Sequence, residues 1–398
     1  MNTRPLNTTE SENLASINRA GISSILLFIT QTGLEKAILD ATEPVRILLH
    51  SQQIHNYEQQ SQGVANKKKT ESLIHTPDGI IALQTSLYRP TTKKGDPRIW
   101  FYGFRKYTSP NDVCAIFVHS EQIHLLNLST SSLASDVNTG ERNILTMFFT
   151  SLFQKSSAVS LELTKKLREL ACNGPLEAVC TGDTAIGRSI ETALGIQINS
   201  SKAPDYKGIE LKSGRASLSG KETRATLFAC VPDWSISQLK SSKDILERYG
   251  YQRETDFKLY CTVSSRTPNS QGLMFDFEEA NRWLHEKHVA SRINKVAVWR
   301  LSTLEQRLVN KHKETFWIKA SAEKRKGREF FNLKSVLRTR NPNLAQLERM
   351  LKDGNVTMDH LIKRTPSGGA QEKGPLFKVT RSRIGELFLG EPAQYNLV

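Results

Sequence analysis

The stretch APDYKGIELKS, residues 203–213, places two acids and a lysine within eight positions of one another: Asp205, Glu210 and Lys212. Its second half is expected to be a short strand, in which side chains two apart share a face. Glu210 and Lys212 then point to one side, while the residues between them point into a core. Lys207-Gly208 can form a turn that brings Asp205 back beside Glu210, so the three polar groups would meet at the edge of a sheet.

This arrangement has two interpretations. The first is an ordinary ion pair on the surface of a strand. The second is a hydrolytic metal site, because two carboxylates at one point repel each other unless a proton or a cation intervenes, and Mg²⁺ prefers hard oxygen ligands. A bound metal would lower the pKa of a water molecule and stabilise charge on a phosphodiester, while Lys212 orients or deprotonates the nucleophile. A further acid, Glu191, borders the buried face of a helix expected near 184–194 and could reach the same site.

The distribution of charge favours a polyanionic partner. The 398 residues carry a formal net charge of +15, but residues 1–150 hold 14 basic and 13 acidic side chains, so nearly all of the excess lies in the rest of the chain. Residues 287–340 alone hold 15 basic and 4 acidic side chains. Such a block attracts nucleic acid at low salt, although a solvated basic face has the same composition.

Composition excludes several other classes. A hydrophobic share of 38% and a charged share of 24% are ordinary for a folded soluble protein. We find neither a run long enough to span a membrane nor a signal peptide, and the five cysteines lack disulfide or zinc spacing, so a reducing cytoplasm is the expected location. There is no nucleophile-elbow pattern and no Walker A loop, so acyl transfer and nucleotide-driven activity are not expected.

The chain is expected to form two domains, residues 1–145 and 146–398. The first is predicted to be a smaller α+β domain with a possible strand at 42–50 and strands at 79–90, 98–104, 113–119 and 123–129. Residues 131–141 read as a linker, followed by two helices that end before Gly174-Pro175. The second domain alternates strands with helices and is predicted to be an α/β layered domain. Strands are expected near 209–213, 224–232, 257–264, 295–301 and 376–380, and helices near 184–194, 235–248, 278–291, 302–311 and 343–352.

The second domain resembles a known family. The pattern Gly-x-x-x-x-Gly-x-x-x-Glu from Gly182 to Glu191, followed by Ala-Pro-Asp and Ile-Glu-Leu-Lys, resembles the MvaI/BcnI family of type II restriction endonucleases and, more distantly, the mismatch-repair nicking enzyme MutH. Residues 226–234 look like the strand that follows the motif, and residues 358–388 look like the C-terminal target-recognition segment. The resemblance covers roughly residues 160–398.

The resemblance implies a PD-(D/E)xK nuclease fold, a mixed sheet flanked by helices, and Mg²⁺-dependent cleavage of double-stranded DNA. Asp205, Glu210 and Lys212 match the catalytic positions and Glu191 matches the helical acid, so the metal would be held by Asp205, Glu210 and the backbone carbonyl of Leu211. The implied setting is a restriction-modification system with a cognate DNA methyltransferase, and a monomer is plausible.

The target-recognition segment departs from the family pattern. A histidine that reads a base in the family is replaced here, most simply by Lys373. Lysine at a base edge would favour guanine, but a phosphate contact is the more ordinary use. The resemblance makes Arg364, Lys373 and Lys378 candidate DNA contacts and leaves the recognition sequence open.

Two alternatives from other functional classes remain. One is a repair endonuclease of MutH type that nicks a single strand. The other is a catalytically silent DNA-binding protein on a nuclease fold, which the intact acids and lysine argue against. In the first domain, residues 87–107 interleave cationic and aromatic side chains, which suits nucleic-acid sensing or, equally, a packed core.

Overall fold

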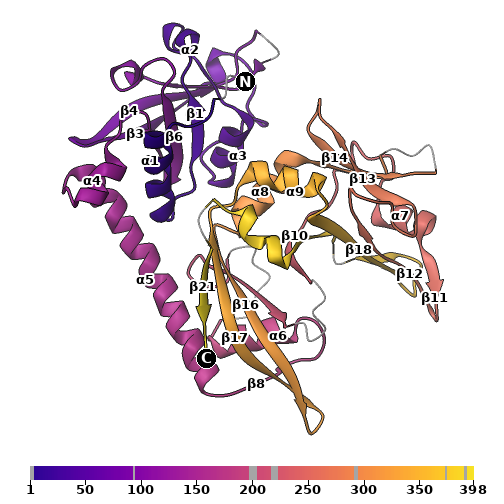
Figure 1. Ribbon diagram of the computed structural model, residues 1–398. Coiled ribbons are helices and arrows are strands. Elements are labelled where there is room, and N and C mark those ends of the chain that lie inside the picture. Colours follow the sequence, from indigo (N-terminus) through magenta and orange to yellow (C-terminus); the bar gives the residue numbers. More distant parts are fainter. Residues whose placement is uncertain are drawn as a thin grey trace. The chain divides into compact units, whose positions relative to one another are not determined.

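The computed structural model describes residues 4–92, 95–196, 204–216, 223–290, 295–372, 374–389 and 392–398. The chain divides into two compact units, unit 1 (Met1–Glu162) and unit 2 (Leu163–Val398) (Figure 1). The division falls within helix α5 (Ile144–Cys172), so this helix contributes to both units. None of the helices in the described ranges is both long and apolar enough to cross a membrane.

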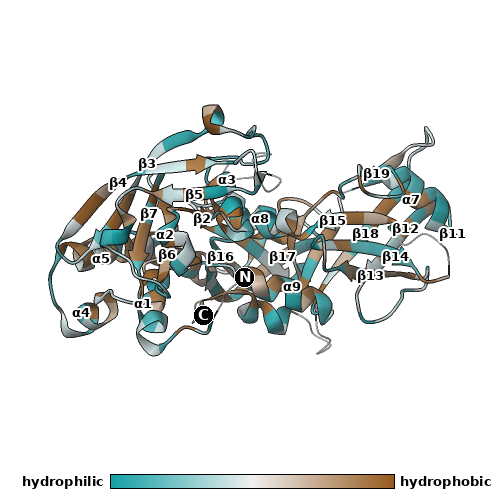
Figure 2. Ribbon diagram, turned by 90° about the horizontal axis from the view of Figure 1, so that it is seen from above, coloured by the Kyte–Doolittle hydropathy of each residue, from teal (hydrophilic) through white to brown (hydrophobic). Residues whose placement is uncertain are grey.

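Unit 1 is built on a seven-stranded sheet of order β1-β6-β7-β3-β4-β5-β2. The expected strands from residue 79 to 129 are confirmed, and most residues of β6 and β7 are buried. Figure 2 colours the ribbon by hydropathy and includes both strands. In chain order the elements are α1 (Thr8–Arg19), β1 (Ile25–Phe28), α2 (Gln31–Glu35), β2 (Leu39–Asp40), α3 (Glu43–Ser51), η1 (Val64–Asn66), β3 (Lys68–Thr76), β4 (Gly79–Tyr88), β5 (Arg98–Phe101), η3 (Phe104–Lys106), β6 (Val113–His119), β7 (Gln122–Asn127) and α4 (Leu133–Thr139).

Three expectations for this part of the chain are wrong. Residues 42–50 form helix α3 rather than a strand, because a proline in the first turn and buried Val45, Leu48 and Leu49 give helical rather than alternating spacing. The expected linker at 131–141 contains helix α4, and the two helices expected after it are the single helix α5.

Unit 2 contains two larger sheets and one small one. The sheet that carries the acid stretch, called here the β9 sheet, has the order β21-β17-β16-β9 with β8 paired to β17, and β9 runs parallel to β16. Its strands are β8 (Leu176–Glu177), β9 (Glu210–Arg215), β16 (Glu314–Arg325), β17 (Arg328–Arg340) and β21 (Ala393–Asn396). Helix α6 (Ala185–Ala193) precedes β9, and β16 with β17 forms the long hairpin that can be followed in Figure 1.

The second sheet, called the β18 sheet, has the order β10-β20-β18-β12-β11 with β19 paired to β18. Its strands are β10 (Arg224–Ala229), β11 (Tyr251–Arg253), β12 (Asp256–Val263), β18 (Val356–Arg364), β19 (Ala370–Glu372) and β20 (Leu376–Thr380). The helices of this region are α7 (Ser242–Tyr249), α8 (Leu301–Lys311) and α9 (Leu344–Lys352), and the short η4 (Arg381–Leu387) follows β20. Together with the small sheet, these elements enclose the largest core of unit 2, which includes Phe275, Trp299 and Phe377.

The small sheet corrects one more expectation. It consists of β13 (Leu273–Glu278), β14 (Trp283–His288) and β15 (Ala297–Arg300), paired in antiparallel order. A helix was expected at 278–291, but the described residues of this range form the turn after β13 and strand β14, which pairs with β13 and β15. The helix-favouring residues of this stretch are overridden because Leu284 and Glu286 are buried between two neighbouring strands.

A buried charged cluster joins β19 to the centre of the β18 sheet. His360 on β18 is 1% exposed, and its Nε2 lies 3.0 Å from Oε2 of Glu286. Its Nδ1 lies 3.8 Å from Oε1 of Glu372 on β19. Burial acts to lower the pKa of His360, but the charge and hydrogen bond of Glu286, with the help of Glu372, outweigh it and raise that pKa to about 9. The histidine is therefore protonated at neutral pH.

We expect this cluster to make the stability of unit 2 depend on pH. A histidine whose pKa is raised by folding stabilises the fold fully below its unfolded pKa of 6.5, and this contribution is lost as the pH rises through about 9. The free energy of unfolding should therefore fall by up to about 3 kcal/mol over that interval. Urea denaturation of the His360→Gln variant should show no such fall, whereas the control His288→Gln should keep it. Equal pH dependence in His360→Gln and wild type would contradict the assignment.

Candidate active site

A tight turn places Asp205 against the start of β9. Tyr206 and Ile209 exchange backbone hydrogen bonds of 2.9 and 2.8 Å, and both Lys207 (φ 45°) and Gly208 (φ 91°) have positive φ. Two consecutive positive φ values are the requirement of a two-residue type I′ hairpin turn, which confirms the expected turn. The turn brings Oδ2 of Asp205 within 2.8 Å of the backbone nitrogen of Leu211, from which it accepts a hydrogen bond.

The first residue of β9, Glu210, is a buried carboxylate held by two lysines. Its side chain is 1% exposed, and Oε1 lies 2.7 Å from Nζ of Lys212 and 3.0 Å from Nζ of Lys311. Lys212 reaches it because side chains two apart on a strand share a face. Oε2 of Glu210 is buried and has no hydrogen-bond partner among the described residues. One oxygen of this carboxylate thus contacts both ammonium groups, and the other can accept a further ligand.

The third acid comes from helix α6. Ile186 and Ile190 bury one face of this helix, and Gly187 allows it to approach Ser213 of β9 closely. Burial raises the pKa of Glu191, and the nearby carboxylate of Asp205 raises it further, against the opposing charge of Lys212. The structure therefore brings Glu191 into the electrostatic environment of the β9 acids, as the sequence indicated.

The donor set fits a hard divalent cation. Asp205 and Glu210 offer carboxylate oxygens at one edge of a sheet, and the buried Oε2 of Glu210 has no other ligand. Within the described ranges, no three or more His, Cys, Asp and Glu side chains are grouped so as to hold a metal. A metal here would rely on two acids, a peptide carbonyl and water, which is how Mg²⁺ is commonly bound.

Lys311 is a site residue that the sequence did not reveal. It ends helix α8, directly before β16, whose Thr315 lies opposite Glu210 in the parallel pairing. About a hundred positions separate it from β9 along the chain, so no local motif connects the two. The only signal was its place in the basic block at 287–340.

On the hypothesis that Glu210 binds Mg²⁺ for DNA cleavage, we expect Lys311→Met to slow cleavage about 10- to 100-fold, because a residue that orients a metal-binding carboxylate commonly has an effect of this size. The Mg²⁺ concentration that gives half-maximal rate should not rise, because the variant removes a cation that competes for Glu210. Single-turnover cleavage measured across a Mg²⁺ titration tests both statements, with Lys243→Ala on the exposed face of α7 as the control. An unchanged rate in a folded variant would rule out the role.

His312, the next residue, fixes the end of α8. The ring is fully buried and stacks on Trp317 at 5.4 Å, and burial together with the charge of Lys212 lowers its pKa to about 3. A neutral ring donates from one nitrogen only, and Nε2 faces the carbonyl of Leu227 at 2.9 Å. Nε2 therefore carries the proton, and Nδ1 accepts from the hydroxyl of Thr315 at 2.9 Å. This side chain links β10 of the β18 sheet to β16 of the β9 sheet.

Two of the three candidate DNA contacts, Arg364 and Lys378, lie on strands of the β18 sheet. Lys378 on β20 pairs with Asp359 at 2.8 Å, beside Arg224, which pairs with the same carboxylate at 2.7 Å. Arg364, at the end of β18, is exposed, and its guanidinium lies 4.0 Å from the ring centroid of Phe257. Both belong to the β18 sheet rather than the β9 sheet. Lys373 lies outside the described residues.

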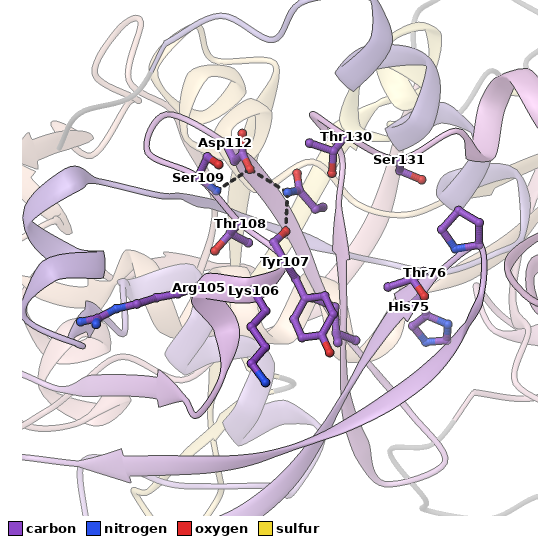
Figure 3. A pocket seen from close by; sticks show the side chains of 13 residues that line it. His75, Thr76, Arg105, Lys106, Tyr107, Thr108, Ser109, Asp112, Thr130 and Ser131 are labelled. Atoms are coloured by element: carbon purple, nitrogen blue, oxygen red, sulfur yellow. Dashed lines mark hydrogen bonds between the residues drawn. The ribbon is translucent and has the colours of Figure 1, made fainter.

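Unit 1 has a pocket of about 320 Å³. Figure 3 shows Asp112 accepting a hydrogen bond from the backbone nitrogen of Ser109. The side chain of Asn127 donates a second hydrogen bond to Asp112. The guanidinium of Arg105 is directed to the carbonyl of Leu34. These polar groups hold the loops of the wall together, and we assign the pocket no ligand. Among the aromatic residues at 87–107, Trp100, Phe101 and Phe104 are buried in the core, which accounts for them structurally.

The fold of this chain is similar to that of solved restriction endonucleases. The complex of the restriction endonuclease MvaI with its cognate DNA substrate is similar at 21% identity and a TM-score of 0.50, covering 59% of this chain and 97% of that one. MvaI in the absence of DNA matches at 19% identity and a TM-score of 0.36, covering 60% and 98%. No curated protein matches.

The family follows from the sequence model of the MvaI/BcnI restriction endonucleases, which matches residues 164–388. The match spans more than half of the chain, and the protein belongs to the MvaI/BcnI restriction endonuclease family. The three acids of the candidate site, Glu191, Asp205 and Glu210, lie within the matched range. So do the two lysines, Lys212 and Lys311.

Proposed function

We propose that this protein is a Mg²⁺-dependent type II restriction endonuclease that hydrolyses phosphodiester bonds in double-stranded DNA at a short specific sequence. The observation that carries the proposal is the pair of acids at the start of β9 with Lys212 bonded to Glu210 at 2.7 Å. Membership of the MvaI/BcnI family supports the restriction activity. We further propose that unit 2 has the PD-(D/E)xK nuclease fold, with β9 as the strand that carries the motif.

Asp205 and Glu210, with the backbone carbonyl of Leu211, would hold the metal. When bound, Mg²⁺ lowers the pKa of a water ligand and stabilises negative charge on phosphate oxygens. The orphan Oε2 of Glu210 supports this assignment, because a buried carboxylate oxygen without a partner is costly unless a ligand completes it.

The chain's own groups would do the remaining work. Lys212, about one quarter exposed, has its ammonium at the carboxylate of Glu210 and can orient the attacking water or take its proton. Lys311 holds the same carboxylate oxygen from the other side and fixes its rotamer. Glu191, whose pKa is raised by burial and by Asp205, can hold a proton at this site more readily than an exposed glutamate.

Recognition of duplex DNA is proposed for the cationic part of unit 2. MvaI, to which unit 2 is similar in fold, has been solved with its cognate DNA. Residues 151–398 carry nearly the whole positive excess of the chain, which would draw a polyanion to this unit. We propose Arg364 and Lys378 of the β18 sheet as DNA contacts and Lys373 as a further one. A cognate DNA methyltransferase is the partner that such an activity would require in a cell.

The test is digestion of supercoiled plasmid DNA by the full chain with MgCl₂ and, in parallel, with EDTA. We expect linear fragments with Mg²⁺ only, and sequencing of their ends should give one short common sequence. Open circles without linear product would instead indicate a strand-nicking activity of MutH type. Intact plasmid under both conditions, with the protein folded and bound to DNA, would indicate the catalytically silent alternative.

A further inference from the structure

Arg381 lies over the strand that carries the candidate catalytic residues. It follows β20 at the start of η4, and its backbone nitrogen donates to the carbonyl of Thr223 at 2.9 Å. A Cβ placed on Gly214 of β9 would lie 1.7 Å from Nη2 of Arg381 and 2.6 Å from its Cζ. The guanidinium thus occupies the space that a side chain at position 214 would need.

The face on which this guanidinium lies follows from strand geometry. Glu210, Lys212 and Gly214 are successive alternate residues of β9, so their Cβ directions point to the same side of the sheet. Two residues along a strand span about 6–7 Å. Arg381 therefore stands next to Lys212, one step further along the same face, and glycine at 214 is what allows it to do so.

Among the described residues, no anion is paired with the guanidinium of Arg381. No hydrogen bond or ion pair of the Arg381 side chain occurs with any of the described residues, whereas Arg383, two positions on, pairs with Glu386 at 2.7 Å. Burial lowers the pKa of Arg381, and no acid in the described part of the chain opposes this effect. A partly buried guanidinium without an anion is unfavourable unless a ligand supplies one, and its planar fork matches the oxygens of a phosphate.

We propose that Arg381 binds a phosphate of the DNA backbone beside the phosphodiester served by Lys212. The ligand class rests on the proposed function, since the polyanion that reaches this face is then duplex DNA. Arg381 also follows directly from β20 of the β18 sheet, which carries the candidate DNA contact Lys378. A phosphate held here would place the substrate between the DNA-contacting sheet and the acid pair.

The first test is the salt dependence of DNA binding, measured without Mg²⁺ on a DNA duplex of arbitrary sequence. One phosphate contact contributes about 0.9 to the slope of log Kd against log salt concentration. We expect Arg381→Gln to lower that slope by about this amount, Arg381→Lys to preserve most of it, and Arg383→Gln to leave it unchanged. An unaltered slope in folded Arg381→Gln would overturn the proposal.

The second test is single-turnover cleavage of plasmid DNA with Mg²⁺. The Arg381→Gln variant should cleave at least about tenfold more slowly, because it lacks the positively charged hydrogen-bond donor next to the reacting phosphate. Gly214→Ala, which displaces the guanidinium without removing it, should slow cleavage as well and decides the matter if Arg381→Gln does not fold. Wild-type rates in both variants would refute the assignment. Failure of wild type to cut would refute the proposed function instead, while the binding slopes would still report on Arg381.

Discussion

Replacing Lys212 with alanine is expected to abolish cleavage and to leave DNA binding nearly unchanged. Lys212 is the only lysine of β9, and its ammonium lies 2.7 Å from the carboxylate of Glu210, where an attacking water would have to be oriented. A positioned acid or base contributes about 10²- to 10⁴-fold to a hydrolytic rate, so the variant should fall to background in a plasmid assay. Binding depends on the wider positive field of unit 2, which loses one charge of many.

The control for this prediction is Lys165→Ala. It removes an exposed lysine of α5 that pairs with Glu169, four residues further along the same helix. It should cut like wild type. Full activity in Lys212→Ala, measured on protein whose circular dichroism matches wild type, would rule out the assigned role. Loss of binding together with cleavage would show that Lys212 serves the fold or the DNA contact instead.

Replacing Glu210 with glutamine is the second change with a large expected effect. The substitution keeps the size of the side chain but removes the charge that pairs with Lys212 and Lys311 and that would hold the metal. A metal site contributes several kcal/mol to stabilising a phosphoryl transition state, so cleavage should fall by at least about 100-fold. Affinity for DNA should not fall, because the site loses a negative charge.

Glu177→Gln, an exposed glutamate of β8 that pairs with Arg328, is the matched control and should retain activity. The Glu210→Gln protein should also remain folded, since the amide can still accept a hydrogen bond from either lysine. Wild-type cleavage at the usual Mg²⁺ concentration in this variant would exclude Glu210 as a metal ligand.

The local part of the site was readable from the sequence because it is encoded within ten residues. Lys207-Gly208 marks a turn that needs two positive φ values, and the alternation after it fixes which side chains share a face. Lys311 and Arg381 reach the same face from α8 and η4, through parallel pairing and the close approach at Gly214. Contacts of that kind depend on tertiary structure, and no spacing in the sequence encodes them.

The longest strands of unit 2 were not predicted. β16 and β17 are 12 and 13 residues long, and their joining turn is again a pair of positive-φ residues, Lys326 and Gly327. The many lysines and arginines at 314–340 interrupt the alternation of buried and exposed side chains that is typical of strands. Their register places Thr315 opposite Glu210 and Trp317 opposite Lys212, so this hairpin supports the site although it supplies none of the predicted residues.

For unit 2, the fold and the family rest on two different observations. The mixed α/β architecture follows from the strand pairing, and the family follows from the match over residues 164–388. The resemblance assigns target recognition to the segment around Lys373, which departs from the family pattern, and this assignment stays a prediction. Unit 1 contains the strands expected between residues 79 and 129 but a helix at the expected strand 42–50, and its role as an accessory or DNA-sensing domain stays a prediction.

The central claim is that Asp205 and Glu210 together bind a divalent cation at the start of β9. Crystals of the full chain grown with duplex DNA and Mn²⁺, with data collected at the manganese absorption edge, measure this directly. The account predicts an anomalous peak within coordination distance of one oxygen of each carboxylate, with Oε2 of Glu210 among the ligands, and no peak in crystals of Glu210→Gln. A structure with Mn²⁺ bound elsewhere, and with both carboxylates still engaged only by Leu211, Lys212 and Lys311, would contradict it.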